Sequence, residues 1–167
     1  LYLRMLAEDP DDATEDAEEF LRNSTLASYY DEVVARALML AQADVNRGVL
    51  DVPRQVRIRD AIQGIVANLS DHSDGSIKRM ELPPPWRDGK PVLCIAGRGP
   101  LDEAAALLLV DMLEKYGMGA QVVSSDQASA SQIDSLDMTG VQVVCVSYLE
   151  PGTYKNARYQ VRRLHKH

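Results

Sequence analysis

The chain has no long apolar run, few cysteines and few histidines. None of its apolar stretches approaches the roughly 20 residues that a membrane-spanning helix needs. The first residues have neither the basic start nor the apolar core of a secretory signal. Because the chain does not begin with methionine, we expect it to be a piece of a longer protein. Two cysteines among 167 residues favour a reducing compartment over a disulfide framework.

A uniformly basic surface is also missing. The formal net charge is −7, and residues 1–72 carry all of it, with 14 acidic against 7 basic side chains. Residues 73–167 contain 11 of each kind. Because contact with phosphates needs a basic face, this balance excludes nucleic-acid binding over the whole chain. The uneven charge suggests two units with different surroundings.

Residues 1–72 are predicted to form an acidic, cap-like bundle of about four helices. One segment, 9–23, starts with acids, which favour a helix N-terminus. The next, 28–48, ends at a glycine typical of the position after a helix, and a further helix is expected over 51–70. The residues expected on the inner faces recur at helical spacing: Ala13, Ala17, Phe20, Leu21, Tyr30, Val33, Val34, Ala37, Leu38, Ala41, Val45, Ile58, Ile62, Ile65, Val66 and Leu69.

Residues 73–90 are interpreted as a linker. Pro83, Pro84 and Pro85 are consecutive, and such a run favours an extended polyproline path. We expect Trp86 to pack the linker against one of the two units, and stacking on a ligand is the alternative.

From residue 91 onward, apolar strands alternate with helices, which predicts an α/β domain over 91–167. This alternation implies a parallel, doubly wound sheet of the Rossmann or flavodoxin-like kind. Right-handed crossovers give three strands the order 2-1-3, and a fuller fold would have more strands, so we predict a truncated version. Strands are expected at 91–96, 120–125 and 141–147, and helices at 101–116, 128–137 and 152–167.

The two cysteines occupy matching places on the first and third of these strands. In the order 2-1-3 those strands are neighbours, about 4.8 Å apart. We therefore predict that Cys94 and Cys145 are buried, reduced thiols close to each other, because parallel neighbours rarely suit disulfide geometry.

The turn after the first strand, Gly97-Arg98-Gly99-Pro100, has the position of a phosphate- or cofactor-binding loop. Ligands of such sheets lie at the carboxyl ends of the strands. The residues that this rule places around one crevice are Gly97, Arg98, Gly99, Asp102, Ser124, Ser147 and Tyr148.

The same turn also has a purely structural interpretation. A dinucleotide fingerprint needs a glycine where Asp102 stands, and Pro100 has no N–H to offer a phosphate. Asp102 and Glu103 complement the helix dipole themselves and would repel an anion. We predict that one of these carboxylates binds backbone N–H groups of the turn or Arg98, closing it from within.

Other chemistries find little support in the sequence. A P-loop lysine is missing, and Ser147 stands where a receiver domain has its phosphoacceptor aspartate. The cluster of Asp71, His72 and Asp74 has no second group of metal ligands to complete it. The histidines lie at segment ends, which disfavours a buried general base. We expect no catalytic residue and no metal site.

The order of the parts resembles the cobalamin-binding module of methionine synthase and of light-sensing regulators. There a helical cap, corresponding to residues 6–50, precedes a strand-turn-helix domain. That family has an Asp-x-His-x-x-Gly motif after the first strand, and its histidine ligates cobalt. Here Asp102 stands at the place of the histidine and Ala105 at the place of the glycine. A carboxylate is a poor substitute as a cobalt ligand, so no cofactor is expected.

A closer resemblance is to the cytoplasmic C-terminal region of bacterial membrane proteins of the autoinducer-2 exporter family, the PerM-like permeases. It rests on the segments "YYDEV" and "LCIAGRGPLDEAAA", with further similarity over 5–13, 40–51 and 147–151. The resemblance implies a non-catalytic accessory or regulatory domain on the cytoplasmic side of the inner membrane. Its partner would be the membrane portion of the same polypeptide, and homo-oligomers are compatible with it. The alternative function is a sensor that binds a small molecule, such as a corrinoid, between helical cap and sheet.

The last segment contains no acid from residue 151 onward. Helical spacing places four cations on one face, namely Lys155, Arg158, Arg162 and Lys166. An opposing apolar stripe is expected from Tyr154, Ala157, Val161 and Leu164. The basic face is either a solvated outer surface or, if the transporter resemblance holds, a face turned toward an anionic membrane.

Overall fold

The computed structural model describes residues 1–7, 10–73, 75–129 and 131–164, and for residues 4, 6, 7 and 10–13 it describes the backbone only. The helical layer comes first and consists of α1 (Tyr2–Ala7), α2 (Pro10–Leu21), α3 (Leu26–Tyr29), η1 (Tyr30–Ala35), α4 (Arg36–Asn46) and α5 (Val52–Asn68). The α/β part then contains α6 (Pro84–Arg87), β1 (Val92–Ala96), α7 (Pro100–Lys115), β2 (Ala120–Val123), η2 (Ile133–Ser135), β3 (Val143–Ser147) and α8 (Tyr154–Leu164). None of the helices in the described residues is long and apolar enough to cross a membrane.

Local signals in the sequence set the ends of the bundle helices. Thr25 and Asp51 are N-caps whose side chains accept backbone N–H groups of the first turn, which removes unsatisfied donors. Gly48 follows α4 with φ +73°, as expected of a residue after a helix. Between α3 and α4 the chain winds as a π-helical turn, η1, so residues 26–46 run as a nearly continuous helix.

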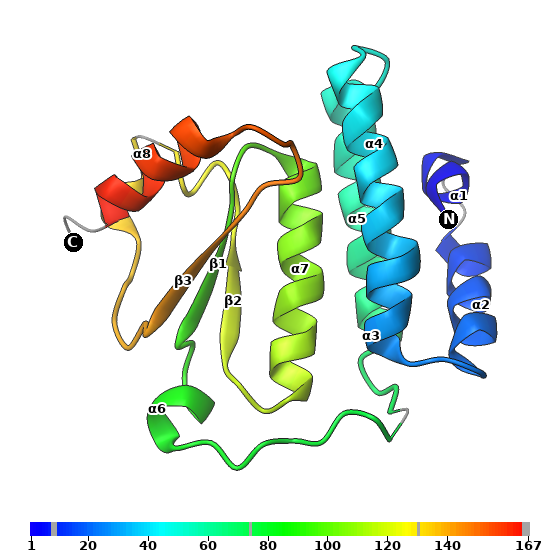
Figure 1. The fold of residues 1–167 in the computed structure, drawn as a ribbon, viewed down its shortest axis with the longest axis horizontal. Helices are drawn as coiled ribbons and strands as arrows, with labels where there is room; N and C mark the ends of the chain where they lie inside the picture. The colour runs from blue at the N-terminus through cyan, green and yellow to red at the C-terminus, as the bar shows by residue number, and fades with distance from the viewer. Residues whose placement is uncertain (8–9, 74, 130, 165–167) are drawn as a thin grey trace.

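The helical layer buries the apolar stripes that the spacing predicts. Ala17, Leu21, Tyr30, Val34, Ala37, Leu38, Ala41, Ile58, Ile62, Ile65 and Leu69 are buried in one core, with Phe20, Val33, Val45 and Val66 partly buried against it. The side chain of Ala13 lies outside the described residues. The same core includes Leu101, Ala104 and Leu108 of α7, so α7 belongs to the packing of both layers (Figure 1).

A buried polar cluster joins α7 to the helical layer. The Tyr30 hydroxyl donates to Oδ2 of Asp111 at 2.9 Å. Lys115 Nζ donates to the carbonyl oxygens of Leu69 at 3.0 Å and Ser70 at 2.7 Å, at the end of α5. The lysine thereby satisfies carbonyls that a helix end leaves without partners.

The sheet has the predicted order β2-β1-β3 and is parallel throughout. Cys94 and Cys145 are register partners on neighbouring strands, and both are free thiols, which confirms their predicted proximity. Cys94 is buried, but Cys145 is only partly buried, because β3 is an edge strand. Burial raises the pKa of the Cys94 thiol to about 12, with Cys145 adding to the shift.

The two faces of the sheet are covered unequally. Val92 and Cys94 point toward α7 and pack with its Ala106, while Leu93 and Ile95 point to the other face, where Leu164 of α8 packs. In Figure 1, α7 runs along the sheet between it and the bundle, whereas α8 lies across the opposite side near the carboxyl ends of the strands.

Two expectations about local structure are corrected. The three prolines do not form an extended path throughout: Pro83 is the N-cap of α6, and Pro84 begins the helix. At this first position the backbone N–H has no partner within a helix, so its absence in proline has no cost. Over 128–129 and 131–137 the described residues form turns and the short η2 instead of a helix, because serine hydroxyls compete for the backbone, as Ser135 does in donating to the carbonyl oxygen of Gln132. Trp86 packs against the α7 side of the sheet, as predicted.

Candidate functional site at the carboxyl edge of the sheet

The turn after β1 is closed by Asp102. Its Oδ2 accepts the backbone N–H of Arg98 at 2.9 Å, and its Oδ1 accepts the backbone N–H of Leu149 at 2.7 Å. One carboxylate therefore ties together the turns that follow β1 and β3. This geometry confirms that the turn is closed by its own side chain, at the place where a phosphate would bind in a nucleotide-binding turn.

Asp102 is only 5% exposed. Burial, the largest influence, raises the pKa of its carboxyl, and the two backbone N–H groups and Arg98 counteract that shift. The neighbouring Glu103 points toward the helical layer instead, where its Oε1 lies 3.6 Å from Nη1 of Arg59 on α5. The two acids at the start of α7 thus have different roles, one inside the turn and one between layers.

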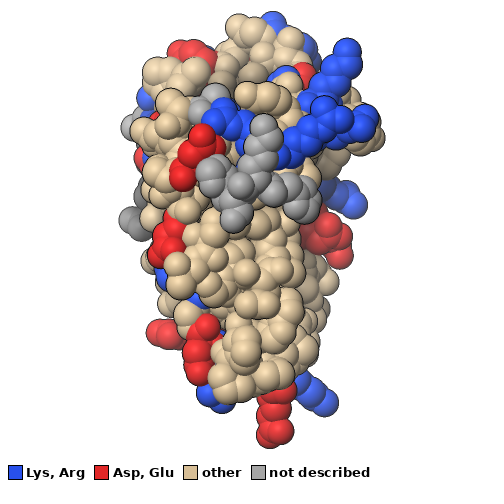
Figure 2. Space-filling model, turned by 90° about the vertical axis from the view of Figure 1, so that its left-hand side faces the viewer, with Lys and Arg blue, Asp and Glu red and all other residues tan. Residues whose placement is uncertain are grey.

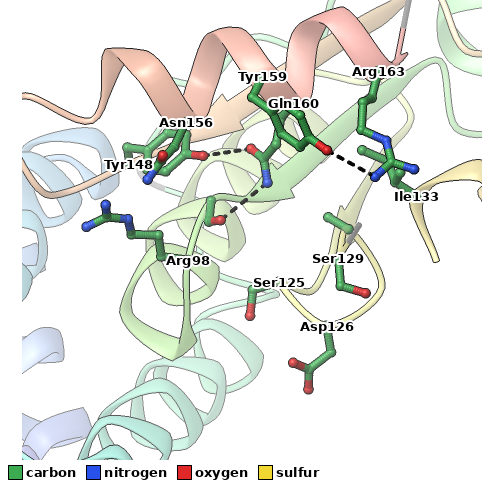
Figure 3. Close-up of a pocket in the computed structure, with 12 residues that line it drawn as sticks. Arg98, Ser125, Asp126, Ser129, Ile133, Tyr148, Asn156, Tyr159, Gln160 and Arg163 are labelled. Atoms are coloured by element: carbon green, nitrogen blue, oxygen red, sulfur yellow. Dashed lines mark hydrogen bonds between the residues drawn. The ribbon is translucent and has the colours of Figure 1, made fainter. Parts of the chain in front are cut away.

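Gly97 is required by packing. A Cβ atom at this position would lie 2.4 Å from Cε1 of Tyr148, because the tyrosine ring rests on the glycine backbone. Gln160 of α8 holds this arrangement: its Nε2 donates to the carbonyl oxygen of Gly97 at 3.3 Å, and its Oε1 accepts the Tyr148 hydroxyl at 2.8 Å. Figure 3 shows both bonds. Tyr148 and Gln160 thus cover the backbone of Gly97.

Arg98 turns outward, with its side chain half exposed. Its Nη1 forms an ion pair with Glu150 in the turn after β3. With the Asn156 amide oriented so that its oxygen faces the guanidinium, that oxygen accepts from Nη2 at 2.7 Å and from Nε at 3.1 Å. Arg98 therefore links the glycine turn to the start of α8.

The other predicted crevice residues are less central. Ser124 caps the turn after β2 by accepting the N–H of Gln127 at 3.3 Å. Ser147 lies in the ladder opposite Ala96, and its carbonyl oxygen accepts the N–H of Gly97 at 2.9 Å. Gly99 is the N-cap of α7 in an extended conformation.

A pocket of about 290 Å³ opens at this edge, and we call it the carboxyl-edge pocket. Its walls are Gly97 and Arg98 after β1, Ser125, Asp126, Ala128, Ser129 and Ile133 after β2, Tyr148 after β3, and Asn156, Tyr159, Gln160 and Arg163 of α8. Of the predicted crevice residues it contains Gly97, Arg98 and Tyr148. The contribution of α8 was not foreseen, because nothing in the spacing of Asn156, Gln160 and Arg163 indicates that they turn toward the sheet.

A second and smaller cavity, of about 200 Å³, lies between the helical layer and the glycine turn. Gln42, Asn46 and Gln55 line it from the helical layer, and Arg98, Gly99 and Asp102 from the turn. This is the crevice between cap and sheet. Its volume is below the roughly 300–1,000 Å³ of pockets for drug-sized ligands, and a corrinoid is larger than such ligands.

The predicted faces of α8 are confirmed in part, since Ala157 and Leu164 of the expected apolar stripe are partly buried and Leu164 packs on the sheet. Lys155, Arg158 and Arg162 are exposed as expected, whereas Lys166 lies outside the described residues. Tyr154 and Val161 were expected on the packed stripe but are 79% and 40% exposed. Polar contacts add to the packing of α8: Gln160 binds the glycine turn, and Arg163 binds both carboxylate oxygens of Asp134 at 3.1 Å.

The residues considered as metal ligands are Asp71, His72 and Asp74, which come after the end of α5 in the sequence and not from the turns at this edge. Within the described residues no three histidine, cysteine or acidic side chains gather as a metal site would require. His72 lies just after α5, and its Nε2 is buried without a hydrogen-bond partner. Asp74, His165 and His167 lie outside the described residues.

Comparison with known proteins adds no relative. No protein-family model matches the chain, and no curated protein or solved structure matches it. The fold and the edge site therefore define only a class, an α/β protein with a three-stranded parallel sheet in the order β2-β1-β3 between a helical layer and a C-terminal helix.

Proposed function

We propose that this chain is a non-catalytic regulatory domain of a bacterial membrane transporter, on the cytoplasmic side, and that α8 holds it against an anionic membrane surface. The observation that carries the proposal is the exposed face of α8. On this face Lys155, Arg158 and Arg162 project together with the exposed Tyr154 and Tyr159. The resemblance of residues 93–106 to a transporter tail supports the choice of partner.

The composition of this face suits a lipid headgroup region. Basic side chains are attracted to anionic lipids, and tyrosine is enriched at membrane interfaces because one end of its ring is apolar and the other polar. Figure 2 shows lysine and arginine side chains gathered near the top of the molecule, where α8 lies. The acidic helical layer lies on the far side of the sheet from α8 (Figure 1). Its negative charges are therefore kept away from the anionic membrane that α8 would contact.

The expected affinity is modest. Each basic residue near an anionic surface contributes about 1 kcal/mol, so the three cations supply about 3 kcal/mol, or about two orders of magnitude in partitioning. Such an interaction suits a domain that is already tethered, because tethering raises its effective concentration at the membrane.

The test is co-sedimentation of the chain with vesicles of phosphatidylcholine alone and of phosphatidylcholine with phosphatidylserine. We expect binding only to the anionic vesicles and its loss at high salt. The double variant Arg158→Glu, Arg162→Glu should not bind. The matched control Lys78→Glu, Lys90→Glu makes the same change of charge in the exposed linker and should still bind. Equal binding to neutral vesicles, or equal loss in both variants, contradicts the proposal.

A second candidate function is sensing of a small molecule. The observation that favours it is the carboxyl-edge pocket, which lies at the edge where ligands of parallel sheets bind and has α8 as one wall. Thermal unfolding with a metabolite library tests it, because a ligand at about 100 times its dissociation constant adds about 2.7 kcal/mol to stability. The stabilisation by such a compound should be lost in the variant Asp126→Ala. If no compound stabilises the natural chain more than the variant, this function is wrong.

A further inference from the structure

The two arginines around the carboxyl-edge pocket are already paired with acids. Arg98 is held by Glu150, and Arg163 is held by Asp134 on the far side. Asp126 adds a carboxylate to the wall formed by the loop after β2. An anionic ligand would have to compete with Glu150 and Asp134 for the arginines. It would also approach the carboxylate of Asp126, so the pocket does not favour anions.

Donors and acceptors nevertheless line opposite sides of the pocket. Ser125, Asp126 and Ser129 come from the loop after β2, and Asn156 comes from α8 across the opening (Figure 3). Gln160 lies beside Asn156, but its amide already bonds Gly97 and Tyr148. A carboxylate only accepts hydrogen bonds, whereas hydroxyls and amides both donate and accept. A ligand hydroxyl also does both, so neighbouring hydroxyls on one ligand match such a mixed lining.

The pocket also has an apolar part. Ala128 and Ile133 are 3% and 2% exposed and are among the residues that line it. Tyr159 contributes an aromatic ring that is 58% exposed. A ligand with a C–H face and a hydroxyl-bearing rim would contact both parts, because the ring and the aliphatic groups accept apolar surface.

We propose that the carboxyl-edge pocket binds a small, neutral, polyhydroxylated ring compound of monosaccharide size. The inference rests on the second candidate function, that the chain senses a small molecule. The volume of about 290 Å³ is just below the roughly 300–1,000 Å³ of pockets for drug-sized ligands, which limits the ligand to one ring. Asp126 accepts from adjacent hydroxyls, and the ring face packs toward Tyr159.

The experiment is a titration of the isotope-labelled chain, followed by amide and side-chain NMR signals. The probes are glucose, galactose, ribose and myo-inositol, with glucose 6-phosphate and glucosamine as charged comparators, each up to tens of millimolar. We expect at least one neutral probe to give saturable shifts confined to residues of the pocket. Asp126→Ala should weaken that binding about tenfold, equivalent to about 1.4 kcal/mol. Asp137→Asn, at an exposed acid of the same connection outside the pocket, should leave it unchanged.

The outcomes separate this proposal from the function on which it rests. Saturable shifts at the pocket from a charged comparator but from no neutral probe overturn the ligand class and keep the sensing function. Shifts outside the pocket, or binding by a neutral probe that survives Asp126→Ala, overturn the assigned site. If neither these probes nor the metabolite library binds, both the ligand class and the sensing function are wrong.

Discussion

The helices α7 and α8 cover opposite faces of the same sheet, yet they are built in different ways. α7 is buried on both sides, against β1 through Ala106 and against the helical layer through Leu101 and Leu108. α8 has no fully buried residue and is held at the edge by Gln160 and Arg163. The difference indicates a division of labour in which α7 is the scaffold, while α8 keeps an exposed outer face and lines the carboxyl-edge pocket with its inner face.

Matched leucine truncations test this contrast most strongly. Leu101 of α7 is 2% exposed, so Leu101→Ala should lower the free energy of unfolding by about 2–5 kcal/mol. Leu164 of α8 is only partly buried, so Leu164→Ala should lower it by about 1 kcal/mol. Urea denaturation of both variants measures the difference, and equal costs would mean that α8 is as much a part of the core as α7.

The two acids at the start of α7 allow a second comparison. Asp102→Ala removes the acceptor of the Arg98 and Leu149 N–H groups, and unsatisfied buried donors cost about 1–3 kcal/mol each. We expect a loss of about 2–4 kcal/mol in unfolding free energy. Glu103→Ala breaks only the long contact with Arg59 and should cost under about 1 kcal/mol. Comparable losses would show that Asp102 does not close the turn.

The buried acid on the other side of α7 gives a dependence on pH. Burial is the largest influence on Asp111 and raises its pKa above 3.8, while the Tyr30 hydrogen bond and the charge of Lys115 lower it. A carboxyl with a raised pKa holds its proton better in the folded chain. Its contribution to stability is therefore complete below the unfolded pKa and is lost as pH rises through the folded one.

The variant Asp111→Asn keeps an acceptor for Tyr30 and removes this titration. The unfolding free energy of the natural chain, relative to Asp111→Asn, should fall as pH rises from about 3.8 through the raised pKa. Urea denaturation of both chains at a series of pH values gives the relative stability. A relative stability that rises over this range would mean that Lys115 and Tyr30 outweigh burial.

The sequence predicts the parts of this contrast that depend on local pattern. Apolar alternation places the strands, the crossover rule gives their order, and Cys94 and Cys145 meet as expected. Asp102 was also predictable as the closing group, since an acid in the first turn of a helix has N–H groups within reach. The sequence of residues 101–116, in contrast, predicts a helix but not that its two sides pack against different layers.

The remainder depends on contacts between residues far apart in the chain. Gln160 reaches Gly97 across 63 positions, and Tyr154 is 79% exposed. Apolar periodicity ranks tyrosine as an inward residue and glutamine as an outward one, so it misplaces these two side chains while it places Leu164 correctly. The contact of the Tyr148 ring with Gly97 likewise depends on tertiary packing, and the spacing of the glycines in the turn does not predict it.

Hydrogen exchange of the α7 and α8 backbone amides, with and without anionic vesicles, tests the division of labour most directly. In the free chain we expect the amides of α8 to exchange much faster than those of α7, because few buried contacts oppose local opening. On vesicles that contain phosphatidylserine, α8 should become protected while α7 stays unchanged. Equal protection of both helices in the free chain, or protection by vesicles that falls on the acidic helical layer instead of α8, would contradict the account.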